Sequence, residues 1–193
     1  MRSEESEAVV AAFEKQMDRP ALKIFRSRKE IVSELLQIAE PIYENLSGKS
    51  EKMGIEYASS SELENEGDFL EALDRNRKRD RYLQYTSQGP HRDDYGLFVN
   101  RLSASDYASE GQQRSITLAL SLAIIQYWRE RKGLLPVALA DDAFAELDTV
   151  RRGRFWELLD EDMQLIATGT QVPAVCRSGE WKTVAVDNGC FGD

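Results

Sequence analysis

The chain has 193 residues, 41% of them hydrophobic, and its 25 basic and 34 acidic side chains give a formal net charge of −9. This length suffices for one or two small domains, and no apolar run approaches the roughly 20 residues that cross a bilayer. The negative net charge argues against DNA binding by the whole surface, but it is compatible with a local basic patch. Two cysteines are too few for a disulfide framework. Because the start lacks a signal-peptide pattern, we expect a soluble cytoplasmic protein that does not bind membranes.

Residues 1–88 are expected to form a mainly helical lid or arm. Residues 20–46 predict a long amphipathic helix, whose apolar stripe consists of Ile24, Ile31, Leu35, Ile38, Ile42 and Leu46. Pro41 is expected to kink this helix or to divide it into two. Residues 53–58 fit a short strand. Residues 61–82 predict a second, highly charged helix, and its polarity favours an exposed position.

Residues 89–193 are expected to form an α/β lobe. The pattern predicts strands at 95–102, 134–140 and 164–168, helices at 109–132 and 149–159, and an edge hairpin formed by 172–177 and 181–186. Apolar strands that alternate with helices indicate a largely parallel sheet. We place the boundary between the helical lid and the α/β lobe near Gln88.

Two adjacent carboxylates come directly after the apolar segment 134–140. A buried strand that ends in Asp141 and Asp142 places both at the carboxyl edge of a sheet, where α/β folds bind ligands. One carboxylate there can hold Mg²⁺, usually through water, while the next orients or deprotonates an attacking water. The alternative is a strand that simply meets solvent, with Asp142 capping the next element of the chain. Thr149 is the expected N-cap of the next helix.

Ser109 and Gly111 begin another predicted helix. A serine hydroxyl and bare backbone amides at a helix N-terminus form a ready anion site, because the helix dipole favours a phosphate there. Glycine also lets another group approach the backbone closely. The alternative is an N-cap serine with Gln112 as the capping-box partner three residues later. The position ahead of the double-aspartate strand favours the phosphate interpretation.

The order of four segments resembles the RecF family of ABC-type ATPases: GPHRDD at 89–94, SEGQQR at 109–114, ADDAFAELD at 140–148 and ATGT at 167–170. This resemblance covers nearly the entire chain. It implies an α/β fold, namely the C-terminal lobe of an ABC/SMC-type P-loop ATPase head with a helical lid-like subdomain.

The resemblance also implies roles for single residues. It assigns the ATP signature to Ser109, Gly111 and Gln112, the metal to Asp141, the catalytic carboxylate to Asp142 and the D-loop to Asp148. Most of the superfamily has glutamate where Asp142 stands, so slow hydrolysis is expected. Thr168, ahead of Thr170, occupies the catalytic switch position, and a loop threonine without function is the alternative for each. His91 is either a nucleotide or DNA contact or part of a structural turn in which Arg92 pairs with Asp93.

A Walker A motif is not found in the sequence. Gly48-Lys49-Ser50 fails as one, because Tyr43 stands where the motif requires its first glycine. The resemblance therefore implies that an N-terminal Walker A lobe is missing from this chain, and that ATP hydrolysis with ATP and Mg²⁺ needs that lobe. It further implies a homodimer formed through the ATP site, sequence-independent binding of gapped or double-stranded DNA, RecR/RecO-type mediator partners, and a role in recombinational repair and replication.

The densest basic run is a candidate DNA contact. Arg75, Arg77, Lys78 and Arg79 would bind phosphates in a salt-sensitive manner. The alternative is a solvated arm in which these residues pair with Glu64, Glu66 and Glu71. Arg151, Arg152 and Arg154 open a helix, a poor place for cations, so a contact with a partner or a nucleotide is one interpretation, and a surface position is the one we expect. The competing hypotheses for the whole chain are a non-catalytic docking or dimerisation lobe and a head fragment of another SMC-like ATPase.

Overall fold

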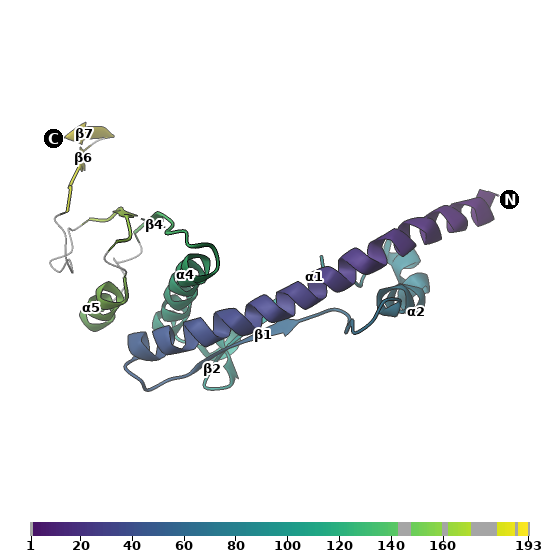
Figure 1. Cartoon of the computed structure of the whole chain (residues 1–193), viewed down its shortest axis with the longest axis horizontal. Helices are drawn as coiled ribbons and strands as arrows, with labels where there is room; N and C mark the ends of the chain where they lie inside the picture. Colours follow the sequence, from purple (N-terminus) through teal and green to yellow (C-terminus); the bar gives the residue numbers. More distant parts are fainter. Residues whose placement is uncertain (1, 143–147, 160–161, 171–180, 188, 193) are drawn as a thin grey trace.

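One long helix, α1 (Arg2–Ser47), organises the molecule (Figure 1). The computed structural model describes residues 2–142, 148–159, 162–170, 181–187 and 189–192. The helix predicted at residues 20–46 is confirmed as part of α1. Of the two outcomes expected at Pro41, a kink or a division, the division does not occur, because the helix continues through Pro41. A proline in a helix interior costs about 3 kcal/mol. Packing outweighs this cost, since the flanking Ala39, Ile42, Tyr43 and Leu46 are all buried.

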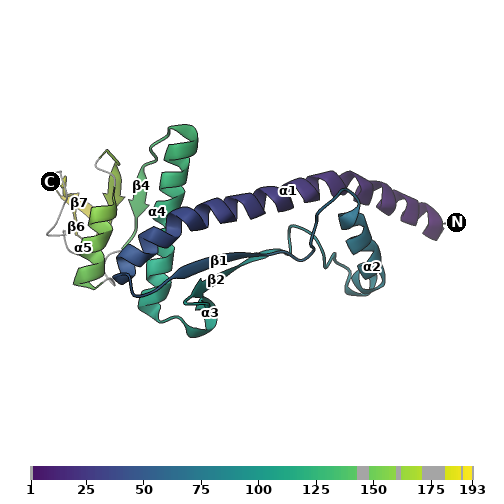
Figure 2. The same cartoon turned by 60° about the horizontal axis from the view of Figure 1, so that its bottom comes forward.

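A three-stranded antiparallel sheet runs beside α1 (Figure 2). Its order is β1 (Met53–Ala58), β2 (Asp94–Val99) and β3 (Leu102–Ser103). The register pairs Met53 with Val99 and Ala58 with Asp94. The strand predicted at 95–102 therefore ends early, because Asn100 and Arg101 both have positive φ and turn the chain into β3. Two such residues form the tight turn that matches the twist of a hairpin.

The charged helix predicted at 61–82 is α2 (Asp68–Leu83), which begins later than expected. The reason is a turn ahead of it: the Asp68 carboxylate accepts hydrogen bonds from the amides of Glu64 and Asn65, both at 2.7 Å. Gly67, with a φ of 100°, precedes the helix. The Gly67 amide donates to Asp18 on α1 at 2.8 Å, which fixes the start of α2 against that helix.

The remaining elements carry the sequence motifs. They are α3 (Ala104–Tyr107), α4 (Glu110–Lys132), β4 (Ala138–Ala140), α5 (Thr149–Leu158), β5 (Leu165–Ala167), β6 (Ala185–Asp187) and β7 (Cys190–Gly192). Strands β4 and β5 are parallel, whereas β6 and β7 are antiparallel. The α/β class is confirmed, but the largely parallel sheet is not, because β4–β5 is the single parallel pair among the described residues. The predicted strand 172–177 lies outside those residues.

Two apolar cores lie along α1. The larger one joins the C-terminal half of α1 to β1, β2, α4 and α5, through Ala39, Tyr43, Leu46, Met53, Val99, Ile116, Ala119, Phe155 and Trp156, among others. The smaller one joins the N-terminal half of α1 to α2 and the segment before it, through Ala21, Leu22, Phe25, Leu63, Phe69 and Leu73. The larger core thus takes residues from both sides of the boundary predicted near Gln88, and β1 pairs with β2 across it. Among the described helices, none combines enough length and apolar character to span a membrane.

Candidate nucleotide site

The ends of β4 and β5 bring together predicted residues from two separate motifs. Ala138 pairs with Leu165 and Ala140 with Ala167, so the residues after both strands emerge at one edge. The Thr168 amide extends the pairing by donating to the carbonyl of Ala140 at 2.9 Å.

The Thr168 hydroxyl organises this edge. It donates to Asp141 Oδ1 at 2.5 Å and accepts a hydrogen bond from the Asp142 amide at 3.0 Å. Asp141 and Asp142 are exposed, and Asp142 has a φ of 47°, which a non-glycine residue rarely adopts. Strain of this kind is concentrated at functional sites. Asp141 is thereby held in one orientation with its carboxylate open to solvent.

The described side chains at this edge do not form a complete metal site by themselves. No group of three or more His, Cys, Asp or Glu side chains suited to a metal occurs among the described residues. Mg²⁺ in nucleotide sites needs few protein ligands, because water and substrate phosphates complete its octahedron. A single carboxylate such as Asp141 therefore fits Mg²⁺ that arrives with a nucleotide better than a metal held by the protein alone.

The start of α4 has the capping-box geometry. The Ser109 hydroxyl accepts from the Gln112 amide at 3.3 Å, and the Ser109 amide donates to Gln112 Oε1 at 2.8 Å. The capping interpretation of these two residues is thus realised. It leaves the phosphate interpretation in place, because Ser109 is exposed and the amides of Glu110 and Gly111 in the first turn have no earlier carbonyl to bond.

Gln112 connects this helix start to α1. Its Nε2 donates to Glu51 Oε1 at 2.8 Å, and Glu51 Oε2 accepts from the hydroxyl of the fully buried Tyr43 at 2.7 Å. Burial raises the pKa of Tyr43 well above its ordinary value, and the hydrogen bond to Glu51 acts in the same direction. The side-chain amide of Gln112 is therefore engaged at both ends in this structure.

Asp148 begins α5. Its Oδ1 accepts from the Arg151 amide at 2.8 Å, which makes Asp148 the N-cap and corrects the expectation for Thr149. The arginines of this helix were expected on the surface, but they are half-buried. Arg151 lies against Gly111, and Arg154 donates to the carbonyl of Leu46 at 3.1 Å. Residues 143–147, the preceding part of the predicted D-loop, lie outside the described residues.

Segment 89–94 is a structural junction centred on Asp93, a role that the sequence did not reveal. The Asp93 carboxylate is 3% exposed and accepts from Arg28 at 3.1 Å, from the hydroxyl of Tyr57, and from the amide and hydroxyl of Ser60 at 2.9 and 3.0 Å. The expected Arg92–Asp93 pair is therefore wrong.

The other two polar residues of this segment contact the loop before it. Arg92 donates to the carbonyl of Thr86 at 3.0 Å and lies over the Tyr85 ring at 4.4 Å. The His91 ring is hydrogen-bonded to the same carbonyl at 3.1 Å, which fits the structural-turn alternative for that residue.

The basic run on α2 is partly neutralised by α1. Arg77 contacts both carboxylate oxygens of Glu14, at 3.2 and 2.8 Å, and also Asp74 at 3.2 Å. The pairing expected with Glu66 is not formed, because Glu66 contacts Arg19 at 3.1 Å. Other members remain available: Arg75, Lys78 and Arg79 are exposed, and in the part of the chain that the structure describes Lys78 and Arg79 have no ion pair. Figures 1 and 2 place α2 and β4 at opposite ends of α1.

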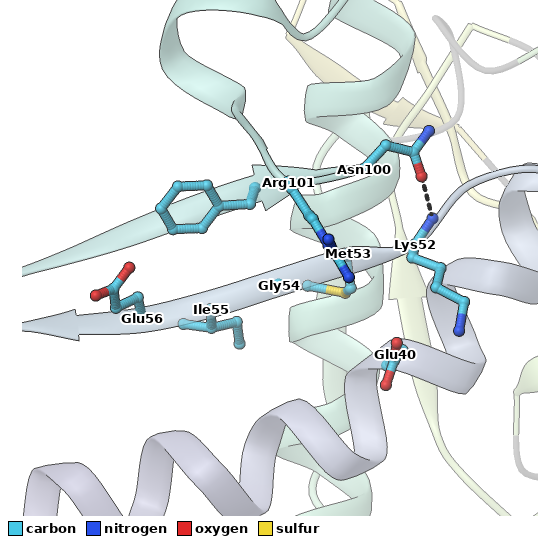
Figure 3. Close-up of a pocket in the computed structure, with 9 residues that line it drawn as sticks. Glu40, Lys52, Met53, Gly54, Ile55, Glu56, Asn100 and Arg101 are labelled. Atoms are coloured by element: carbon cyan, nitrogen blue, oxygen red, sulfur yellow. Dashed lines mark hydrogen bonds between the residues drawn. The ribbon is translucent and has the colours of Figure 1, made fainter.

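A pocket of about 820 Å³ lies apart from these motifs, between α1 and the β1–β2 pair (Figure 3). Charges of both signs line it, namely Glu40, Lys52, Glu56 and Arg101. The Asn100 side chain accepts a hydrogen bond from the Lys52 amide at 2.9 Å, drawn as a dashed line in Figure 3. None of the residues predicted for the nucleotide site lines this pocket.

Comparisons with known proteins agree with the motif order. The chain is 32% identical over 170 residues to a "DNA replication and repair protein RecF" of Streptococcus suis strain 05ZYH33, covering 86% of this chain and 46% of that protein. The RecF of Streptococcus thermophilus strain LMD-9 is 32% identical over 185 residues, covering 93% and 50%, and that of Clostridium tetani is 30% identical over 189 residues, covering 94% and 51%. No family model matches the chain.

A solved structure also matches, described as the recombination mediator protein RecF-ATP in the RecFOR pathway. Its TM-score is 0.75 at 25% identity, and the match covers 87% of this chain and 46% of that one. The chain thus spans about half the length of the relatives it matches. These matches confirm the resemblance and the fold that the motifs predict.

Proposed function

We propose that this chain, a counterpart of the C-terminal portion of RecF proteins, supplies the Walker B, D-loop and signature elements of an ATPase that dimerises on DNA. The observation that carries the proposal is the meeting of Asp141, Asp142 and Thr168 at the edge of β4 and β5. The comparison structure is described as a complex with ATP, which gives ATP as the ligand to test.

Each residue at this edge has a distinct task. Asp141, held by the Thr168 hydroxyl, would bind Mg²⁺ that accompanies the nucleotide. Asp142 would orient and deprotonate the attacking water. Aspartate reaches one methylene less far than the usual glutamate, so turnover should be slow. Thr168 acts in this arrangement by fixing both aspartates at once.

The exposed strands support a second lobe at this site. Leu139 is 76% exposed and Ile166 53% exposed, on adjacent parallel strands. Parallel sheets occur almost only with both faces covered, because their side chains are apolar on both sides. A lobe that carries a Walker A motif would cover this face and bring the triphosphate to Asp141 and Asp142.

The signature would serve a partner subunit. Ser109 and Gly111, at the start of α4, would contact the γ-phosphate of ATP bound by a second copy, with Asp148 near the same interface. Gln112 would support the signature through its bonds to Ser109 and Glu51. ATP binding would then join two subunits, and hydrolysis would release them.

DNA would bind the outer side of α2. Arg75, Lys78 and Arg79 are the exposed cations there, whereas Arg77 is committed to Glu14. Such contacts go to phosphates and carry no sequence information, which fits binding to gapped or double-stranded DNA in repair. Mediator proteins of the RecR and RecO type would join the complete assembly, since the comparison structure is described within the RecFOR pathway.

The test is ATP-dependent dimerisation of the chain supplied with the Walker A half of a RecF relative. Light scattering should show a dimer with ATP and Mg²⁺ and a monomer without them. Ser109→Arg should abolish the dimer because the side chain fills the phosphate position, while Ser105→Arg, on the exposed face of α3, should not. A dimer that forms equally without ATP would instead favour a non-catalytic docking lobe.

A further inference from the structure

Arg151 joins the starts of two helices that carry different motifs. Its Nη1 is 3.3 Å from Asp148 Oδ2 at the start of α5. The same nitrogen lies 2.6 Å from the position that a Cβ on Gly111 would occupy, at the start of α4. The guanidinium is therefore packed directly on the signature backbone while it is paired with the D-loop aspartate.

The position of Arg151 is electrostatically unfavourable. A cation in the first turn of a helix opposes the helix dipole, and here it faces the starts of both α4 and α5. Asp148 offsets this cost locally. Arg154, on the same helix, contacts the end of α1 and not a motif, so the contact with Gly111 belongs to Arg151 specifically.

We propose that Arg151 is a positioning residue that couples the D-loop to the signature within one subunit. The inference rests on the proposed function, in which Asp148 follows Asp141 and Asp142 of the subunit's own ATP site along the chain, while Gly111 faces the ATP bound by the partner subunit. A displacement of Asp148 moves Arg151, and Arg151 moves the backbone that carries Gly111. The two ATP sites of a dimer are then linked through each subunit, so they bind and hydrolyse ATP cooperatively.

The contact itself can be tested without nucleotide. Gly111→Ala, Arg151→Ala and the double variant of the 193-residue chain would be compared by thermal unfolding. Alanine stabilises a helix relative to glycine, but here it must displace Arg151. Gly111→Ala should therefore raise Tm by about 2 °C more in the Arg151→Ala background than in the wild type. Additive Tm shifts would overturn the contact.

The coupling is tested by ATP hydrolysis as a function of ATP concentration, in the chain supplied with a Walker A half. The wild type should give a Hill coefficient between 1 and 2, the limit for two sites, and Arg151→Ala should lower it to about 1. Arg154→Ala is the matched control: it removes the contact with Leu46, so it should lower Tm and leave the Hill coefficient unchanged.

The possible results separate the two proposals. A wild-type Hill coefficient of 1, or an Arg151→Ala variant that retains the wild-type coefficient, overturns the coupling while the proposed function stands. An assembly that neither dimerises with ATP nor hydrolyses it counts against the proposed function and removes the basis of the coupling. The Gly111–Arg151 comparison still decides whether the contact exists.

Discussion

Replacement of Asp93 is expected to have the largest effect among the polar residues of segment 89–94. Asp93→Ala removes the shared acceptor of Arg28, Tyr57 and Ser60. Removing one partner of a buried ion pair costs about 3–5 kcal/mol, and the lower end applies because Arg28 is 34% exposed and can regain water. The expected loss of about 3 kcal/mol lowers Tm by about 6–12 °C in a chain of this size.

The assay is thermal unfolding followed by circular dichroism, with Asp94→Ala as the neighbouring control. Asp94 is exposed, and among the described residues its carboxylate accepts only from the adjacent Tyr95 amide, at 2.8 Å, so its replacement should change stability by less than about 0.5 kcal/mol. Equal Tm values for Asp93→Ala and the wild type, or an equal drop for Asp94→Ala, would refute the assignment of Asp93 as the junction.

The loss of stability caused by Asp93→Ala should also depend on pH. Burial raises the pKa of Asp93, but the hydrogen bonds from Tyr57 and Ser60 and the charge of Arg28 outweigh it and lower the pKa below its usual range. A folded-state pKa below the unfolded value of about 3.9 means that the ionised carboxylate stabilises the fold above that pH. The stabilisation is lost as the pH falls through the folded pKa. The Tm difference between wild type and Asp93→Ala should therefore shrink below about pH 4.

Three further predictions concern other contacts. Tyr43→Phe removes the hydroxyl bound to Glu51 and should cost about 1 kcal/mol, measured by urea unfolding. Thr168→Val should slow ATP turnover of the assembled protein about 10²-fold, because it releases the two aspartates, whereas Thr168→Ser should retain most activity. Replacing Lys78 and Arg79 together by alanine should reduce the slope of log K against log salt for binding to duplex DNA by about 1.8, and an unchanged slope would exclude them as phosphate contacts.

The meeting of Asp141 and Thr168 at one strand edge could be predicted because it follows from local rules. Parallel strands place their carboxyl ends at one edge, so Asp141 and Thr168 meet although they are 27 residues apart. The helix after Ser109 is likewise set by a capping box and a regular apolar pattern. Periodicity could not indicate which ligand binds at this edge, and the expectation of a nucleotide came from the motif order.

Contacts between distant polar residues could not be predicted. Asp93 takes its cationic partner from α1, 65 residues away, and the pattern of the sequence contains no signal that prefers Arg28 to the adjacent Arg92. The same limit hid the contact between Arg151 and Gly111. The helix through Pro41 shows a different reason: tertiary burial around the proline overrides its local preference, and burial is not visible before the fold is known.

In the proposed function, Asp142 acts on the water that attacks ATP, in a site completed by a Walker A lobe. The most direct measurement is single-turnover hydrolysis of ATP by wild type and Asp142→Asn, each supplied with the Walker A half of a RecF relative. Asp142→Asn should still dimerise with ATP but cleave it at least about 10²-fold more slowly, and the chain alone should show no turnover. Cleavage at the wild-type rate by Asp142→Asn would exclude this role for Asp142, and robust turnover by the chain alone would exclude the need for a Walker A lobe.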